Sequence, residues 1–385
     1  MTGVTTVKKI IEGGLGLAFF EGKTVFLPFA APGDRVEFSV EKESGNILFS
    51  RIEKILEPSA LRIEPACPNF TQCPGCDFLH LSYNDEAETK RGMTAETFMR
   101  IGKSGIDTDN MIQSPGRFGY RSSVTFEFDE EGRPGLRSPE SEEVVPFPPD
   151  GCPLLSENTR AAVQELTGRS CRNSGPALAV TDKFGIARIW GVKGIIETPD
   201  ILLETAGNLF PVRPRPPIID NLYLREKFVE TVTSMPDTPE GRIVELFCGE
   251  GTLSLAFARK GLKVLGIDED RVSIEDAETA ARLNEIAGAQ FIRGRMQKAL
   301  REIRGVNSLL VSPPQGGISK PLLKWILKEE PAEITINSAD AATLARDLRR
   351  LKDKGYRLNK SCIIDLYPGK SSSRIVINLK NSPEG

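Results

Sequence analysis

Seven cysteines stand in this chain of 385 residues, and four of them are spaced as ligands of a metal centre would be. Cys67, Cys73 and Cys76 form a C-x5-C-x2-C pattern, and Cys152 follows 76 residues later. Proline and glycine flank them, so these loops can fold tightly and aim backbone N–H groups at sulfur. Four thiolates suit either zinc or an iron–sulfur cluster, and spacing alone does not choose between them. Buried free cysteines are the alternative. The other three are scattered and are predicted to be ordinary: Cys171, Cys248 and Cys362.

A second group of residues has the order of a nucleotide-binding loop. Glu245 lies near the end of an apolar strand, Gly249 and Gly251 form a tight turn, and a helix then begins. A second strand ends at Asp268, where a carboxylate can accept hydrogen bonds from ribose hydroxyls. The glycines let a ligand approach the backbone and the helix N-terminus. An acidic residue before the loop and no third glycine favour S-adenosylmethionine (SAM) over a nicotinamide dinucleotide. A Rossmann-like fold with an empty crevice is the alternative.

The elements that must position these residues fall into three predicted domains. Residues 1–60 carry short alternating apolar runs broken by glycine- and proline-containing turns, which predicts a small OB-like β-barrel. Residues 61–215 hold the cysteines and predict a mixed α/β central domain. Its predicted elements are a helix at 91–103, strands near 120–129 and 176–193, and a helix near 156–168.

Residues 216–385 predict a C-terminal Rossmann-like α/β domain. The proline-rich segment 211–217 is expected to be a stiff linker into it. Strand and helix patterns then alternate, as in a parallel sheet covered by helices. The predicted elements are strands at 243–247 and 263–268 and helices at 252–260 and 270–287.

Composition excludes several classes of protein. An apolar fraction of 39% is enough for real cores and excludes global disorder. No apolar run approaches the roughly 20 residues of a membrane span, and no signal-peptide core is visible, so we expect a cytoplasmic protein without membrane contact. The net charge of −3 gives no bulk-charge argument for nucleic-acid binding. The single histidine, His80, leaves no multi-histidine metal site.

Several motifs, in order along nearly the whole chain, resemble those of the bacterial RNA uridine-C5 methyltransferases. This family joins a TRAM barrel, a 4Fe-4S central domain and a class I SAM-binding domain. The matching segments are Pro32-Gly33-Asp34, the cysteine run at 67–76, His80 to Tyr83 with Lys90, Gly119-Tyr120-Arg121, Cys152, the loop at 246–252, the segment at 342–348, and Asp365 to Pro368.

The resemblance implies a set of cofactors, partners and site residues. It implies a 4Fe-4S cluster rather than zinc on Cys67, Cys73, Cys76 and Cys152. It implies RNA, either tRNA or rRNA, as the partner of a monomeric protein. It also implies bound SAM, with contacts at Asn221, Glu245, Gly249, Gly251, Asp268 and Ser312.

The chain departs from the family where the chemistry is done. Uracil C5 is a poor nucleophile, so the family adds a cysteine thiolate to C6, methylates the enolate and removes the C5 proton with a glutamate. The cysteine position is Ala339 here, and the glutamate position is Arg374, which cannot accept a proton. The family's Asp-Pro-Pro-Arg run is replaced by residues 312–315, which begin with Ser312 and end with Gln315. Near the cofactor, Ile219 and Arg295 also differ.

Three functions remain open. The chain is a SAM-dependent RNA methyltransferase with altered chemistry, such as methylation of a nitrogen through Ser312-Pro313-Pro314. Alternatively it is a non-catalytic protein that binds SAM and RNA. A small-molecule methyltransferase is disfavoured, because barrels of this type usually contact nucleic acid. Eight basic residues are candidate RNA contacts: Lys8, Lys9, Lys23, Arg35, Lys90, Arg91, Arg117 and Arg121.

Overall fold

The N-terminal residues form a six-stranded sheet with the order β1-β5-β6-β4-β3-β2. The computed structural model describes residues 1–139, 141–168, 176–192, 201–213, 219–237, 241–301 and 303–382. In the N-terminal sheet, neighbouring strands are antiparallel except β4 and β6, which are parallel. Alternate residues such as Val36 and Phe38 point into one small core. The strands are β1 (Thr2–Thr6), β2 (Lys9–Ile11), β3 (Leu15–Phe20), β4 (Lys23–Leu27), β5 (Arg35–Ser44) and β6 (Ile47–Glu57). The all-β prediction for residues 1–60 agrees with these strands, while closure into a barrel stays a prediction.

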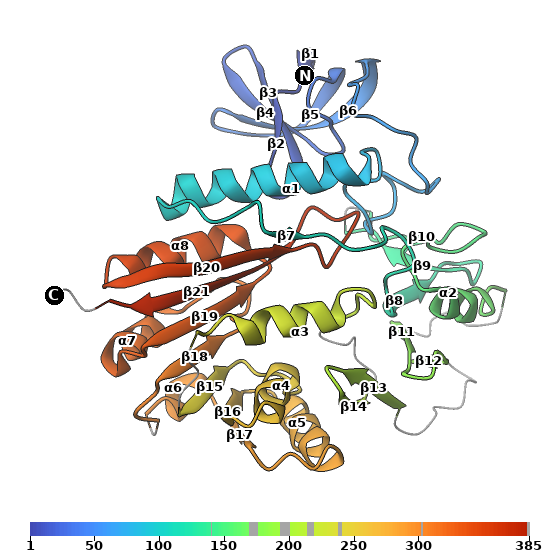
Figure 1. The fold of residues 1–385 in the computed structure, drawn as a ribbon. Coiled ribbons are helices and arrows are strands. Elements are labelled where there is room, and N and C mark those ends of the chain that lie inside the picture. The colour runs from blue at the N-terminus through green and yellow to red at the C-terminus, as the bar shows by residue number, and fades with distance from the viewer. Residues whose placement is uncertain are drawn as a thin grey trace.

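A long helix, α1 (Tyr83–Thr97), lies beneath this sheet and continues as a π-helical turn, η1 (Phe98–Gly102). Figure 1 shows α1 between the N-terminal sheet and the rest of the molecule. Ser82 caps the helix by accepting a hydrogen bond from the Asp85 backbone N–H. The helix predicted at 91–103 therefore begins earlier, at Tyr83.

The central part of the chain is a five-stranded sheet with the order β10-β9-β8-β11-β12. One helix, α2 (Glu157–Gln164), packs on it, and a separate hairpin follows. The sheet strands are β8 (Ser123–Phe128), β9 (Pro134–Arg137), β10 (Val144–Pro146), β11 (Ala177–Thr181) and β12 (Ala187–Trp190), and the hairpin is β13 (Ile201–Thr205) with β14 (Asn208–Val212). Part of the predicted linker, residues 214–217, lies outside the described residues.

The C-terminal part is an eight-stranded sheet with the order β17-β16-β15-β18-β19-β21-β20-β7. The strands β15 to β19 are parallel, and β21 is antiparallel to both of its neighbours. Its strands are β7 (Met111–Ile112), β15 (Arg242–Leu246), β16 (Lys263–Asp268), β17 (Ala289–Arg293), β18 (Ser308–Val311), β19 (Glu333–Ser338), β20 (Tyr356–Ile364) and β21 (Arg374–Asn381).

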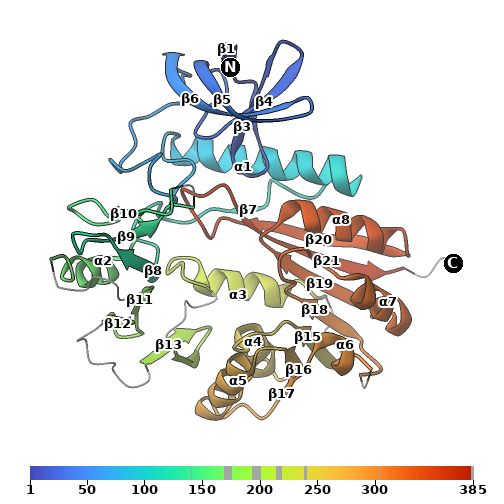
Figure 2. The same cartoon turned by 180° about the vertical axis from the view of Figure 1, so that it is seen from behind.

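Helices cover both faces of this sheet, as its continuous apolar strands require (Figure 2). Successive strand residues alternate between two cores. Val244 faces the core that includes α7 and α8, and Ile243 faces the core that includes α3 and α4. The helices are α3 (Arg225–Ser234), α4 (Thr252–Arg259), α5 (Arg271–Leu283), α6 (Met296–Ala299), α7 (Lys320–Glu329) and α8 (Ala341–Lys352).

One strand crosses the predicted boundary between the central and C-terminal domains. The short β7, from the predicted central domain, pairs in parallel with the end of β20. Phe98 of η1 is buried in the same core as α8. The segment from α1 to β7 therefore packs with the C-terminal sheet, which local sequence patterns do not indicate. Among the described residues, no helix is both long and apolar enough to cross a membrane.

Candidate functional site

The strand order indicates where a ligand would bind, at one edge of the C-terminal sheet. The first strand of the domain, β15, lies between β16 and β18, so the chain reverses its direction of winding there. Ligands of open α/β sheets bind outside the carboxyl ends of the strands at such a point. The loop after Leu246 and the segment after Val311 meet there, where the Ser312 backbone N–H donates to the Leu246 carbonyl at 3.2 Å.

The glycine loop after β15 is held against the end of β16. The Gly249 backbone N–H donates to Asp268 Oδ2 at 2.9 Å. Gly251 begins α4 with a φ of +82°, which glycine adopts at little cost. A Cβ on Gly251 would lie 2.8 Å from the Phe291 ring, so close packing against β17 also requires glycine here. Asp268 lies at the carboxyl edge, with its second oxygen accepting from the Asp270 backbone N–H.

Glu245, predicted as a cofactor contact, points into the protein instead. Its side chain is buried and accepts a hydrogen bond from the Ser254 hydroxyl of α4. Burial raises the pKa of this carboxyl to about 8. The carboxyl thus joins β15 to α4 behind the glycine loop, and the sequence interpretation of a ligand-facing acid was wrong in this respect.

Asn221, like Glu245, was predicted to contact the cofactor, but its side-chain amide makes hydrogen bonds within the protein instead. Its Oδ1 accepts from the backbone N–H groups of Tyr223 and Leu224, and its Nδ2 donates to the Leu366 carbonyl at 3.0 Å. The side chain is completely buried. Asn221 therefore fixes the start of α3 to the β20–β21 connection, rather than presenting its amide to a ligand. Its neighbour Ile219 is buried in the α3–α4 core.

The two residues predicted to stand at the family's cysteine and glutamate positions, Ala339 and Arg374, come together at the carboxyl edge. Ser338, the last residue of β19, pairs with Ile375 of β21, so Ala339 and Arg374 follow directly beyond this pair. Ala339 is exposed. Arg374 donates to the Tyr367 hydroxyl at 3.3 Å and lies over the Phe228 ring, 6.0 Å from its centroid.

Ser312 lies at the same edge, and a residue that the sequence analysis missed holds its hydroxyl. The Asn337 side-chain amide donates to Ser312 Oγ at 3.3 Å. Asn337 is buried in β19, where Glu333, Thr335 and Ser338 are polar and buried as well, so the sequence pattern gave no separate signal for it. Gln315 and Arg295 are both exposed.

The two described cysteines outside the four-cysteine pattern both have buried thiols. The Cys248 side chain is buried beside Gly266, and burial raises the pKa of its thiol. The Cys362 thiol is buried in β20 and donates to the Asn110 carbonyl, and burial raises its pKa to about 11. Cys171 lies outside the described residues.

The four patterned cysteines line one small cavity in the central part of the molecule. Cys67, Cys73, Cys76 and Cys152 surround it together with apolar side chains and Arg121. Burial raises the pKa of the Cys73 and Cys152 thiols. Within the described ranges, no three cysteine, histidine or acidic side chains are close enough together to hold a single metal ion. The donor set itself, four sulfurs on one cavity, fits the thiolate chemistry of an iron–sulfur cluster.

The cysteine segment is fastened to the loop that joins β20 to β21. The backbone N–H groups of Asp77 and Phe78 both donate to the Gly369 carbonyl, at 2.7 and 3.0 Å. The Lys370 ammonium donates to the Pro74 carbonyl at 2.9 Å. Since β21 begins at Arg374, these contacts connect the cysteine cavity to the carboxyl edge of the sheet.

Two of the predicted RNA contacts are buried structural groups. The Lys90 ammonium is 1% exposed and donates to Glu86 and Asp365 at 2.7 and 2.8 Å. Arg117 donates to Glu86 and to the carbonyls of Phe78 and Leu81. Both predictions were wrong, because Lys90 ties α1 to the β20–β21 connection and Arg117 ties Glu86 of α1 to the segment just before the helix. Four others form exposed or half-exposed ion pairs with glutamates: Lys9, Lys23, Arg35 and Arg91.

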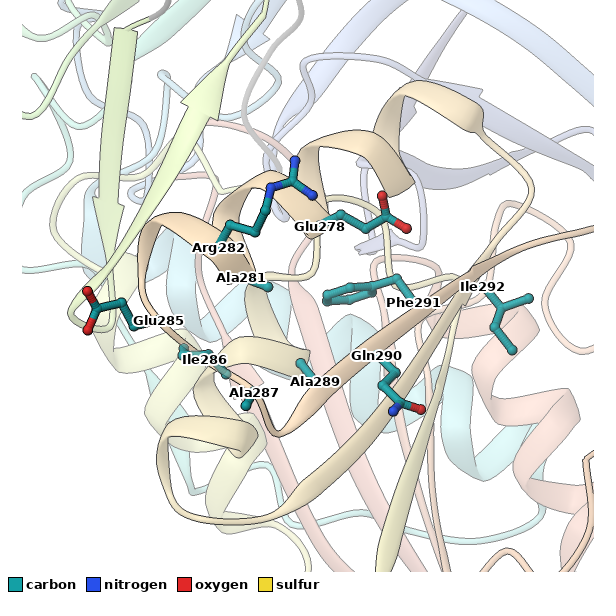
Figure 3. Close-up of a pocket in the computed structure, with 10 residues that line it drawn as sticks. All are labelled: Glu278, Ala281, Arg282, Glu285, Ile286, Ala287, Ala289, Gln290, Phe291 and Ile292. Atoms are coloured by element: carbon teal, nitrogen blue, oxygen red, sulfur yellow. The ribbon is translucent and has the colours of Figure 1, made fainter.

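An open hollow on the far edge of the same sheet is separate from this site. Residues of α5, of the loop after it and of β17 line it, as Figure 3 shows. The Phe291 ring lies at its inner side, where it also packs against Gly251. Four strands lie between β17 and β21 in the sheet order. The hollow therefore does not include Ala339 or Arg374.

The strand order and the glycine loop together define a multidomain protein with a SAM-methyltransferase fold. The protein family described as “Methyltransferase domain” matches residues 237–307. A crystal structure of the Pyrococcus abyssi tRNA (uracil-54, C5)-methyltransferase in complex with S-adenosyl-L-homocysteine has the same fold. Its TM-score is 0.75 at 21% identity, over 98% of this chain and 100% of that one.

Curated relatives extend the similarity along the whole chain. An uncharacterized RNA methyltransferase of Listeria innocua is 25% identical, over 94% of each chain. The 23S rRNA (uracil(1939)-C(5))-methyltransferase RlmD of Vibrio parahaemolyticus is 25% identical, over 95% of this chain and 93% of its own. The resemblance to the RNA uridine-C5 methyltransferases is thereby confirmed.

Proposed function

We propose that this chain binds SAM and RNA and belongs functionally with the RNA methyltransferases, but does not methylate uridine C5 by the covalent mechanism. SAM would lie at the carboxyl edge of the sheet, against the Gly249–Gly251 loop, with Asp268 beside its ribose and Ser312 at the methyl end. The relatives named for RNA methylation support RNA as the partner. The fold shared with a protein solved with S-adenosyl-L-homocysteine supports the cofactor.

One observation carries the chemical part of this proposal. The residues beyond the β19–β21 pair are Ala339 and Arg374, where covalent methylation needs a thiol and a proton acceptor. The methyl side chain of Ala339 is no nucleophile and cannot add to uracil C6, as a cysteine thiolate would. A guanidinium, which stays protonated, cannot remove the C5 proton. The thiols of Cys248 and Cys362 are buried.

A second candidate is methylation of a nitrogen, which needs no covalent nucleophile. The Ser312 hydroxyl favours it, because Asn337 holds this hydroxyl at the carboxyl edge. A hydroxyl beside two prolines is suited to hold an exocyclic amine of a base. The exposed Gln315 supplies no aromatic ring to stack on that base.

We also propose that Cys67, Cys73, Cys76 and Cys152 bind a 4Fe-4S cluster. The cavity that the four sulfurs share supports it, and so does the attachment of the cysteine segment to the β20–β21 loop. The bonds from the cluster to the four sulfurs would hold these loops together, and the cluster would lie away from the site of methyl transfer.

We further propose that residues 1–60 form a TRAM-like barrel that contacts RNA. The protein would be a cytoplasmic monomer with domain limits near residues 60 and 215.

The test is methyl transfer from labelled SAM to total RNA of a deletion strain. The protein is purified without oxygen, and the nucleosides are identified by mass spectrometry. The proposal predicts SAM binding with no label in 5-methyluridine. Label on a nitrogen would establish the second candidate. Label in 5-methyluridine would refute the argument from Ala339 and Arg374, and absence of SAM binding would refute the cofactor assignment.

A further inference from the structure

Two buried polar groups without a hydrogen-bond partner lie on one face of the carboxyl edge. They are Asn337 Oδ1 and Arg374 Nε. Asn337 pairs with Val376, two residues from Arg374 in β21. Residues opposite each other in a sheet share a face, and so do residues two apart in a strand. Asn337 and Arg374 are thus diagonal neighbours, about 7–8 Å apart at the backbone, within reach of an arginine side chain.

The Arg374 guanidinium is held in place but is not neutralised. Its Nη2 donates to the Tyr367 hydroxyl, and the Phe228 ring lies beneath it. Across the described ranges, no carboxylate pairs with Arg374. The carboxylate of Asp365, nine positions earlier in the chain, is already engaged by Lys90 and Tyr83. A half-buried charge of this kind is costly, and a bound anion would relieve that cost.

Asn337 supplies a second donor in one of its two amide orientations. As placed, Nδ2 donates to Ser312 Oγ and Oδ1 has no partner. A half-turn of the amide lets the Ser312 hydroxyl donate to Oδ1 and leaves Nδ2 free to donate. The two orientations of an asparagine amide are assigned from such networks. Arg374 Nε and Asn337 Nδ2 are then two donors on one face of the sheet, near the end of β19 that leads into Ala339.

We infer that Arg374 and Asn337 bind an oxyanion at this edge, and that the oxyanion is a phosphate of the bound RNA. The inference rests on the proposed RNA binding. The planar guanidinium fork matches two phosphate oxygens, whereas it offers no acceptor to an amine. The site therefore fixes the RNA backbone next to Ala339. The SAM carboxylate is the other oxyanion within the proposed complex, and the test separates the two.

The test compares Arg374→Gln with the wild type in binding a fluorescein-labelled oligouridylate 15-mer over a range of KCl concentrations. One phosphate contact on a single strand contributes about 0.7 to the slope of log affinity against log salt. We expect the slope to fall by about 0.7 and the affinity at low salt to fall about tenfold. Arg374→Lys should keep most of the slope, because it keeps the charge. SAM affinity, measured calorimetrically, should stay unchanged in both variants.

The matched control is Arg357→Gln at the other end of β20, where the arginine is exposed. It should leave slope and affinity unchanged. If the wild type binds the RNA and Arg374→Gln binds it with the same slope, the inference is wrong and the proposed function stands. Loss of SAM affinity alone would assign the oxyanion to the SAM carboxylate and overturn the inference. If the wild type binds no RNA, both the inference and the proposed RNA binding are overturned. If Arg374→Gln does not fold, Asn337→Asp replaces it, because a carboxylate beside Arg374 should expel the phosphate.

Discussion

Replacing Glu245 with glutamine should stabilise the protein, and the gain should depend on pH. The Glu245 carboxyl is buried between β15 and α4, where burial raises its pKa from 4.5 to about 8. Glutamine keeps an oxygen for the Ser254 hydroxyl and has no charge to bury. The substitution therefore removes the cost of ionising a buried acid and leaves the hydrogen bond.

The sign and size of the effect follow from the two protonation states. Below about pH 4.5 the carboxyl is neutral in both the folded and the unfolded chain, so the wild type loses nothing there. Between pH 4.5 and 8 the unfolded chain gives up the proton and the folded chain keeps it, so the free energy of unfolding falls as pH rises. At 1.36 kcal/mol for each pKa unit, the loss reaches about 5 kcal/mol above pH 8. The glutamine variant avoids this loss.

Urea unfolding at pH 5 and at pH 8.5 measures the difference, with Trp325 as a fluorescent reporter in the core of the same sheet. Glu245→Gln should be close to the wild type at pH 5 and clearly more stable at pH 8.5. The exposed Glu278 of α5 gives the control Glu278→Gln, with an expected change within about 0.5 kcal/mol at both pH values. A gain of equal size at both pH values would refute the assignment of a buried, protonated carboxyl.

Three further predictions concern the connections around the site. Lys90→Met leaves the buried carboxylates of Glu86 and Asp365 without their shared cation, so thermal and urea unfolding should show a loss of about 3–5 kcal/mol; an unchanged melting temperature would contradict this. Cys73→Ser should lose iron and solubility, and a soluble variant with full iron and sulfide content would exclude the four-cysteine cluster. Ala339→Cys alone should give no 5-methyluridine by nucleoside mass spectrometry, because Arg374 still cannot take the C5 proton. Appearance of that nucleoside would show that the proton leaves by another route.

The regular strands of the C-terminal sheet could be predicted because they are buried on both faces. Such strands are continuous apolar runs, and the predicted strand at 243–247 differs from β15 by one residue at each end. The start of α1 could not be predicted in this way. Its inward face includes the buried Glu86 and Lys90, so the usual apolar periodicity is missing.

In the site, the sequence pattern placed polar residues at strand ends but did not predict which way their side chains point. A polar residue at a strand end can face a ligand or the interior, and sequence does not separate the two. Glu245 and Asn221 were predicted to face the cofactor, yet both are buried and bonded within the protein. Asn337 was missed because β19 also carries the polar residues Glu333 and Thr335, so the asparagine does not stand out in the sequence. The pairing across β19 and β21, which brings it near Arg374, depends on long-range register.

The contacts of the β20–β21 connection join the cysteine segment to the carboxyl edge of the sheet. This connection receives hydrogen bonds from the cysteine segment at Gly369 and from Lys90 at Asp365. It then leads into Arg374, at the carboxyl edge of the sheet. A cluster that holds the cysteine segment would therefore stabilise the start of β21 whatever residue stands there. A substitution at Ala339 would leave that stabilisation intact, whereas losing the cysteines would loosen the edge on which the proposed phosphate site depends.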